Sequence, residues 1–157
     1  MNQLEWESSV PQDMKNDVLW KAKVYRLALF VAELAWRDTT KIIEAHDIRS
    51  KSLADQLYRA VTSISANIAE GYSRGTGKDR AHFYEYALGS ARESRDWYFK
   101  ARHILEDKVS SHRIELLTAI IQLMLVSIPD QRPKTFRETP SSYSPHPDLS
   151  DPPTNDA

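Results

Sequence analysis

The sequence predicts an all-α fold, an antiparallel up-down bundle of four helices, from two observations. Four stretches between residues 17 and 128 repeat apolar side chains at spacings of three and four, the period of an α-helix that buries one face. The connections between these stretches are short, and short connections favour antiparallel neighbours. The chain has 157 residues, enough for one domain with a hydrophobic core.

The composition excludes several classes of protein. The chain has no cysteine, which rules out disulfides and thiolate chemistry. Its polar, acidic first residues do not resemble a signal peptide. The most apolar stretch, from Ile114 to Ile128, is interrupted by Glu115 and Gln122 and is expected to be too short to span a bilayer. We therefore expect a cytoplasmic protein that has no membrane partner.

The formal net charge of −1 is unevenly distributed along the chain. Residues 18–128 carry 17 basic and 13 acidic side chains, a net charge of +4. Residues 1–17 carry a net −3 and residues 129–157 a net −2. A mildly basic body with acidic ends is compatible with nucleic-acid binding but does not by itself require it.

The first 16 residues are expected to form a flexible arm, since the first 12 show no periodicity and include Pro11. The first long helix should begin near Asn16 or Asp17. Its apolar positions form two series that together cover more than one face. Such a helix is buried on two sides, either in an oligomer interface or in the centre of its own bundle. The sequence of this helix alone leaves both readings open.

The second helix is expected over residues 52–75, with a capping-box-like start at Ser52 and Asp55. One face is apolar. A stripe of amide, hydroxyl, carboxylate and guanidinium groups runs beside it, and such groups are costly to bury without hydrogen-bond partners. The stripe therefore predicts a polar seam between helices. Its members are Gln56, Arg59, Ser63, Asn67, Glu70 and Arg74.

The third helix is expected over residues 78–107, after a turn in which Thr76 and Asp79 repeat the capping pattern. Small residues cluster in its middle and would allow close approach to small residues of the second helix, among them Gly71. We expect Ser90 and Glu93 to face Asn67, Ser63 or Arg59. The small cluster consists of Ala87, Gly89, Ser90 and Ala91.

The fourth helix should begin after a break at residues 107–111 and run to Ile128. It carries two apolar seams, so a second surface needs cover, which strengthens the expectation of an oligomer. From Pro129 onward the chain is rich in proline, serine and acidic residues. Residues 129–157 are expected to be a disordered acidic tail.

The motif residues also resemble a known family. The run DQLYRAVTSISANIAEGYSRG (Asp55–Gly75), followed by ALGSARES (Ala87–Ser94), resembles the four-helix-bundle proteins encoded by intervening sequences in bacterial large-subunit ribosomal RNA genes. Accessory variability determinant proteins of diversity-generating retroelements share that fold family. The resemblance covers roughly residues 17–128. The motif positions are Gln56, Arg59, Ser63, Asn67, Glu70, Gly71, Gly89, Ser90 and Glu93.

The resemblance implies a homopentameric barrel. For the retroelement members it also implies binding of nucleic acid and of a reverse transcriptase. It does not separate a ribosomal RNA intervening-sequence protein from a retroelement accessory protein. We interpret the shared motif residues as structural.

Patterns that would support catalysis or a bound cofactor are not found. A di-iron bundle needs Glu-x-x-His on two helices, and that motif does not occur. The histidines show no metal-ligand spacing, Gly75-x-Gly77 lacks the rest of a phosphate-binding loop, and Ser63 has no histidine at a helical offset. We expect a non-catalytic protein without metal or cofactor.

The remaining functional candidate is electrostatic. Cations interleaved with Phe99 on the third helix, and further cations around the turn before it, would suit phosphate contacts and base stacking. The alternative is a solvated face in which Asp96 pairs with Arg92 or Lys100 and Glu106 with Arg102. The candidate nucleic-acid-binding residues are Arg74, Lys78, Arg80, Arg92, Arg95 and Arg102.

Two functions follow from these expectations. The first is a homo-oligomeric accessory protein that binds RNA or DNA and assists a reverse transcriptase. The second is a protein-interaction scaffold whose acidic tail engages a partner or masks the basic body.

Overall fold

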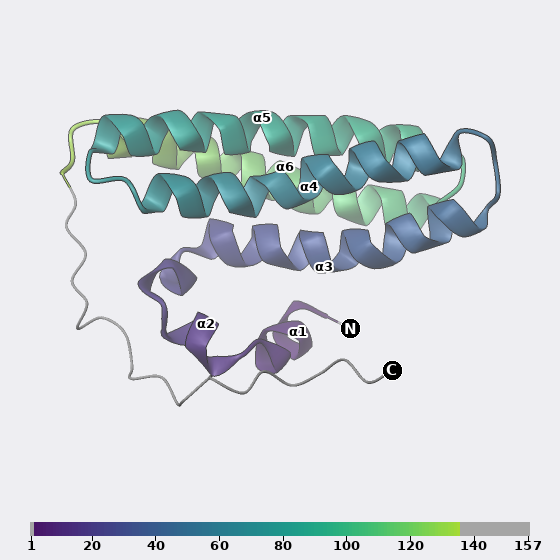
Figure 1. Ribbon diagram of the computed structural model, residues 1–157, viewed down its shortest axis with the longest axis horizontal. Helices are drawn as coiled ribbons and strands as arrows, with labels where there is room; N and C mark the ends of the chain where they lie inside the picture. Colours follow the sequence, from purple (N-terminus) through teal and green to yellow (C-terminus); the bar gives the residue numbers. More distant parts are fainter. Residues whose placement is uncertain (1, 136–157) are drawn as a thin grey trace, which may run out of the picture.

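The all-α expectation is confirmed by a computed structural model of the chain, which describes residues 2–135. The elements in that range are six α-helices and one 3₁₀ helix. Four of the helices are long and lie side by side, each antiparallel to the next (Figure 1). They are α3 (Lys23–Glu44), α4 (Ser50–Tyr72), α5 (Gly77–Ala101) and α6 (Asp107–Gln131).

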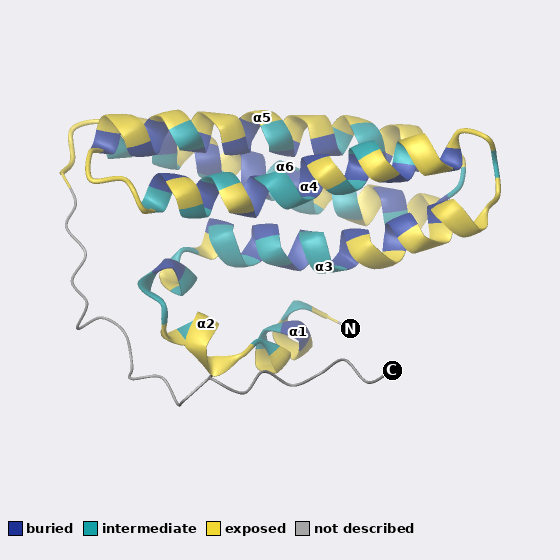
Figure 2. Cartoon of the chain, in the orientation of Figure 1, coloured by how far each residue is buried: buried dark blue, intermediate teal, exposed yellow. Residues whose placement is uncertain are grey.

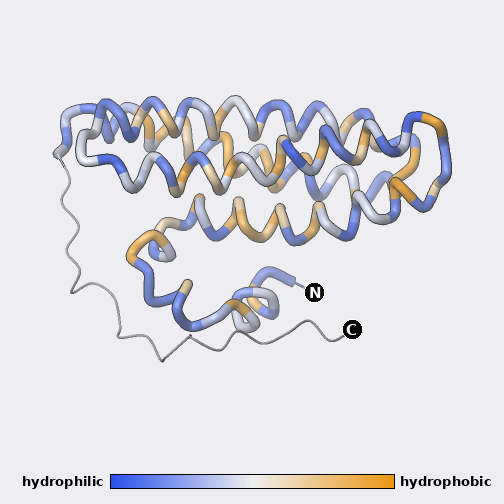
Figure 3. Tube along the Cα trace, viewed as in Figure 1, coloured by the Kyte–Doolittle hydropathy of each residue, from blue (hydrophilic) through white to orange (hydrophobic). Residues whose placement is uncertain are grey.

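The core lies between the four long helices, each of which turns its buried stripe inward (Figure 2). The hydropathy of the chain follows the same pattern, with apolar residues on the inner sides of the helices (Figure 3). This burial is the main favourable term in folding. The fully buried large side chains include Val31, Leu57, Ile64, Ile68, Tyr98, Leu117, Ile120 and Met124.

The N-terminal residues form ordered helices rather than the expected loose arm. They comprise α1 (Gln3–Ser9), α2 (Gln12–Asn16) and the 3₁₀ helix η1 (Val18–Lys21). Asn2 and Glu5 form a capping box that starts α1. Trp6 is buried against Phe30 of α3, with ring centroids 5.4 Å apart. The segment is thus anchored at two points, by Trp6 of α1 and by Leu19 of η1, which is buried in the main core.

The arm covers one of the two apolar sides of the first long helix. The buried cluster of Trp6, Phe30 and Leu34 contacts Leu116 of α6, and Arg26 pairs with Glu7 at 3.4 Å. Val24, Leu27 and Val31 of the same helix lie in the main core. Much of the double-sided burial of this helix therefore arises within one chain, which was the alternative to an oligomer interface.

The turn between α4 and α5 confirms the predicted cap. The Thr76 hydroxyl accepts a hydrogen bond from the Asp79 backbone amide at 3.2 Å. The predicted cap at Ser52 and Asp55 is wrong, since α4 begins two residues earlier at Ser50 without a side-chain cap.

The last long helix also differs from the prediction at both ends. It begins at Asp107, where a break was expected, and continues through Pro129 to Gln131. Residues 132–135 then fold back, so that the Gly77 amide donates to the Lys134 carbonyl at 2.7 Å. A Cβ at position 77 would lie 1.8 Å from the Gln131 carbonyl oxygen, which explains the glycine. The expected tail is therefore ordered over residues 129–135, and its remainder lies outside the described residues.

Candidate nucleic-acid interface

Three of the predicted cations form a stripe on α5 along its border with α6. Arg92, Arg95, Phe99 and Arg102 follow one another at spacings of three and four, which places them on one flank of a helix. The stripe rises about 15 Å from Arg92 to Arg102 at 1.5 Å per residue. We use the term α5 stripe for these four residues.

Arg92 is the most available cation of the α5 stripe. It is exposed and makes no hydrogen bond or ion pair with any residue between 2 and 135. The carboxylate of Asp96, one turn away, pairs with Lys100 at 2.5 Å instead. Arg92 can therefore bind an external anion without breaking an internal contact.

Phe99 and Arg102 form the far end of the α5 stripe. Phe99 is 54% exposed, and the Arg102 guanidinium carbon lies 3.8 Å from its ring centroid. Arg102 also donates to the Phe99 carbonyl at 2.6 Å. The expected pair of Arg102 with Glu106 is not formed, because Glu106 pairs with Lys41 and Lys108. The hydrogen bond from Lys108, followed by the one from Lys41, lowers the pKa of Glu106.

Arg95 connects the α5 stripe to α6. It is half-buried, and its Nη1 donates to the Thr118 hydroxyl at 3.4 Å. A contact of this length with a neutral partner is weak. The guanidinium can therefore exchange it for a phosphate at little cost.

The three cations near the α4–α5 turn differ in exposure and in their partners. Lys78 is exposed and has no partner among the described residues. Arg74 is exposed, pairs with Glu70 and lies 4.5 Å from the Phe83 ring centroid. Arg80 is only 6% exposed and donates to the Tyr72 carbonyl at 2.6 Å. Arg80 thus satisfies the C-terminal end of α4, and its assignment as a phosphate contact is wrong for this structure.

The predicted cations form two groups rather than one patch. Lys78 and Arg102 lie at opposite ends of α5, separated by about 36 Å of helix. The first group is Arg74 and Lys78 at the turn, and the second is the α5 stripe. A ligand that touches both groups must follow the length of the bundle.

The polar motif residues join α4 to α5 at one point. The Ser63 hydroxyl donates to the Ser90 hydroxyl at 2.6 Å, as predicted for this seam. The other interactions stay within one helix: Asn67 donates to the Ser63 carbonyl at 2.8 Å, and Glu93 accepts from the Trp97 indole at 3.1 Å. Glu93 thus faces α4 as expected, since it lines a groove with Arg59 and Ser63, but its hydrogen bond stays within α5.

The rest of the motif opens toward solvent. A groove of about 500 Å³ is lined by residues of α4 and by Glu93 of α5. Arg59 is exposed and pairs with Asp55 at 3.9 Å, and Gln56 has no partner among the described residues. The residues from α4 that line it are Gln56, Arg59, Ala60, Thr62, Ser63 and Ala66.

The two motif glycines have different environments. A Cβ on Gly71 would lie 2.9 Å from the Cβ of Phe83 and 2.9 Å from the ring of Tyr84. Gly71 therefore permits the close packing of α4 on α5. Gly89 is exposed, and a Cβ there would meet nothing within 4 Å. The prediction that Gly89 lies against α4 is wrong.

The family of the chain is established by comparison with protein-family models. The model of the 23S rRNA-intervening sequence protein family matches residues 21–126. The chain belongs to the 23S rRNA-intervening sequence protein family. None of the curated proteins compared with the chain matches it. The family region contains both the polar motif and the α5 stripe, whereas α1 and α2 lie outside it.

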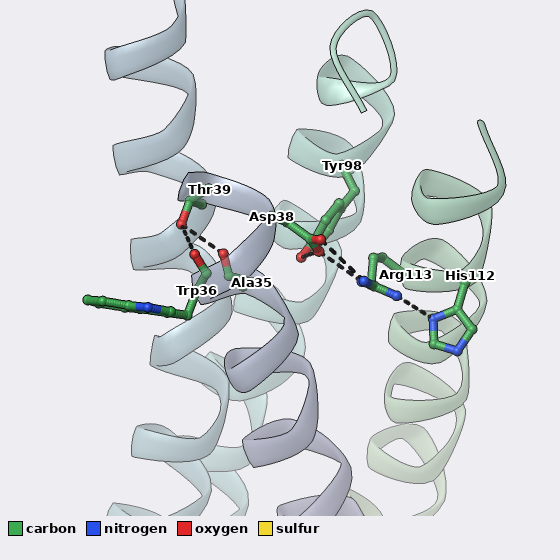
Figure 4. Close-up of polar contacts among 7 residues, drawn as sticks. All are labelled: Ala35, Trp36, Asp38, Thr39, Tyr98, His112 and Arg113. Carbon is green, nitrogen blue, oxygen red and sulfur yellow. Dashed lines mark hydrogen bonds and ion pairs between the residues drawn. The ribbon is translucent and has the colours of Figure 1, made fainter. Parts of the chain in front are cut away.

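The family region contains a buried polar network that the sequence analysis missed (Figure 4). Asp38 of α3 accepts from the Tyr98 hydroxyl of α5 at 2.9 Å and from Nε of Arg113 of α6 at 2.8 Å. Arg113 Nη2 adds a contact of 3.2 Å, and its Nη1 lies 2.9 Å from His112 Nδ1. Burial, followed by the Asp38 charge, raises the pKa of Tyr98 well above its ordinary value.

The missed network had a signal in the sequence. Asp38 occupies a core position of α3, four residues before Ile42 and three after Ala35. Arg113 stands four residues before the fully buried Leu117. A charge at a core position of a helix needs a partner, and that requirement points to a buried ion pair.

Two further tests concern metals and membranes. Within residues 2–135, no group of three His, Asp or Glu side chains is arranged to hold a metal ion. Helix α6 is long and apolar enough to cross a bilayer by length and composition, although the core helix of a soluble protein passes the same test. Only 28% of its apolar window is buried in this chain, and Leu125 and Val126 are exposed.

Proposed function

We propose that this member of the 23S rRNA-intervening sequence protein family is a non-catalytic accessory protein that binds nucleic acid through the α5 stripe. The observation that carries the proposal is the exposed Arg92, which has no acceptor within residues 2–135, beside the exposed Phe99 under Arg102. Cations with an interposed aromatic ring suit phosphate contacts and base stacking.

The proposal includes self-assembly into a homopentameric barrel. Trp36 of α3 is 64% exposed and Ile43 is 52% exposed, although large apolar side chains are usually covered. Hollows of about 340 Å³ and 320 Å³ lie on either side of Trp36. We propose that other copies of the chain cover this surface. If the α5 stripe is repeated around an assembly, several weak contacts can bind one nucleic acid at the same time, which raises the overall affinity.

We also propose a protein partner and a cellular location. The likeness to retroelement accessory proteins in the motif residues suggests a reverse transcriptase as the protein partner. We place the protein in the cytoplasm, with α6 packed in the bundle and without a membrane partner.

The test measures binding of labelled oligonucleotides by fluorescence anisotropy at low salt. The double variant Arg92→Gln and Arg95→Gln should weaken binding by about tenfold or more, since each arginine that binds a phosphate displaces counterions and glutamine does not. The matched control is Arg37→Gln with Arg59→Gln, two exposed arginines outside α5 that pair with Glu33 at 3.5 Å and with Asp55 at 3.9 Å. Absence of binding, or equal binding by the double variant and the control, contradicts the proposal.

A second candidate is a protein-interaction scaffold without a nucleic-acid role. It is favoured by the number of predicted cations that are engaged within the chain: Arg80 is buried, and Arg74 pairs with Glu70. Under this alternative the exposed Trp36 surface is the functional site, and the acidic tail would engage a partner. Deletion of residues 136–157, which leaves the ordered end of α6 intact, would then abolish partner binding, and the natural chain would bind no nucleic acid at low salt.

A further inference from the structure

A groove of about 700 Å³ lies where the N-terminal end of α4 meets the C-terminal end of α5. Its volume falls in the range of sites that hold small molecules in proteins, about 300–1,000 Å³. None of the residues placed in the α5 stripe lines it. The lining residues are Asp47, Ile48, Arg49, Ser52, Leu53, Trp97, Lys100, His103 and Ile104.

The groove combines an aromatic and aliphatic surface with basic side chains at its edge. Trp97 is half-buried, and its indole nitrogen donates to Glu93 at 3.1 Å, which holds the ring in place. Leu53 and Ile104 are also half-buried and pack against the core. A flat aromatic ring can therefore bind here without a rearrangement of these side chains.

The charge of the groove favours an anionic ligand. Two cationic side chains, those of Arg49 and Lys100, line it together with the His103 imidazole and one carboxylate, that of Asp47. Arg49 binds both oxygens of this carboxylate at 2.8 Å and holds the pKa of Asp47 well below its usual range. The groove also adjoins the start of α4, whose first turn carries no acidic residue.

Lys100 can move from its present contacts to a ligand at little cost. Its ammonium group lies 4.2 Å from the Trp97 ring centroid and 2.5 Å from Asp96. Both members of this ion pair are about half exposed, and exposed pairs contribute at most about 1 kcal/mol. A phosphate can therefore replace Asp96, and the movement of Lys100 would uncover the Trp97 ring.

The groove and the α5 stripe both reach the C-terminal end of α5. Phe99 and Arg102 of the stripe are each followed in the sequence by a residue that lines the groove, Lys100 and His103 respectively. A flexible strand can pass from one to the other. A duplex keeps its bases stacked and paired, so no base could enter the groove.

We propose that this groove holds one unstacked nucleotide of a single strand, with its base on Trp97 and its phosphate at Lys100 and His103. The inference rests on the proposed function and makes it specific: the nucleic acid is single-stranded, either RNA or DNA.

The experiment compares oligo(dT), oligo(rU) and a duplex, each of about ten nucleotides or base pairs, which is within the usual site size of such proteins. Anisotropy of the full chain is measured with each probe. We expect at least one single strand to bind about tenfold more tightly than the duplex. The two single strands distinguish a DNA site from an RNA site.

The variant for this test is Lys100→Ala with His103→Ala, both exposed residues. It should weaken single-strand binding by about fivefold or more, because it removes the two side chains placed at the phosphate, and leave duplex binding unchanged. The matched control is Lys51→Ala with His82→Ala, which removes one lysine and one histidine outside the groove. Trp97→Leu should show the same weakening for single strands, with circular dichroism to verify its folding.

The outcomes separate this inference from the proposed function. Binding that depends on Arg92 and Arg95 but is equal for single strands and duplex, and insensitive to Lys100 and His103, overturns this inference alone. Absence of any nucleic-acid binding at low salt overturns both. Binding of a poly-glutamate peptide that depends on Lys100 and His103, without single-strand binding, would overturn the inference and assign the groove to an acidic protein.

Discussion

Buried polar side chains give the bundle its most specific internal contacts. Asp38, Tyr98 and Arg113 come from three helices and meet in a network that is nearly closed to solvent. Removing one partner of such a network leaves an uncompensated buried group, which typically costs about 3–5 kcal/mol. These residues therefore fix how α3, α5 and α6 are placed relative to one another.

The alkaline stability of the protein should depend on Tyr98. Its pKa in the folded chain lies above the unfolded value of about 10, so the folded state keeps a proton that the unfolded state releases. The stabilisation is fully present below about pH 10 and is lost as the pH rises toward the folded pKa. Urea unfolding at increasing pH should show the advantage of the natural chain over Tyr98→Phe shrinking above about pH 10.

Tyr25 and Tyr84, whose pKa values are also raised by burial, are present in both chains and serve as the internal reference. A constant difference between the two chains across this pH range would contradict the account of the network.

The two motif glycines should respond in opposite directions to alanine. Gly71→Ala should destabilise the chain by about 1–3 kcal/mol, because the added methyl group meets Phe83 and Tyr84. Gly89→Ala should stabilise it by about 0.5–1 kcal/mol, because the site is open and alanine favours helix. Thermal unfolding measures both. A loss of stability in Gly89→Ala would show that another surface approaches this position.

At the scale of elements, the N-terminal arm is the main departure from the sequence prediction. Short helices give too few turns for a periodic signal, so α1 and α2 had none. Their order comes from Trp6, whose partners Phe30 and Leu34 lie more than 20 positions further along the chain. Long-range contacts of this kind are not visible in local patterns.

The importance of this contact can be tested with one substitution in the arm. Trp6→Ala should lower the free energy of unfolding by about 3 kcal/mol, the typical cost of removing a buried aromatic side chain. The control, Leu4→Ala, changes a residue of the same helix that is 79% exposed and should have an effect within about 0.5 kcal/mol. Equal effects in urea unfolding would mean that the arm does not contribute to the stability of the bundle.

The long helices were predictable because their periodic patterns span several turns. Their boundaries were less predictable, since α4 begins at Ser50 rather than Ser52 and Asp107 lies inside α6. For the candidate site, the sequence placed Arg92, Arg95 and Arg102 together on one flank. It could not show that Arg80 is buried beneath Tyr72, since that depends on how the turn folds back on α4.

At the scale of the whole molecule, the exposed apolar surface around Trp36 is the feature that self-assembly would cover. If the proposed pentamer forms, light scattering should give about 90 kDa, five chains of 18.1 kDa each. Trp36→Glu should reduce this mass by placing a charge in the interface. Ile48→Glu, at an apolar position that is 96% exposed on a connection between helices, should not. A natural chain that scatters as an 18.1 kDa monomer would contradict the assembly.

Nucleic-acid binding by the α5 stripe is the central claim, and the salt dependence of affinity tests it most directly. The logarithm of the binding constant should fall linearly with the logarithm of salt concentration, because phosphate contacts release counterions. With Arg92→Gln and Arg95→Gln together, the slope for a single strand should become shallower by about 1.4, that is about 0.7 for each arginine replaced. An unchanged slope would show that these two arginines do not contact phosphate and would contradict the account.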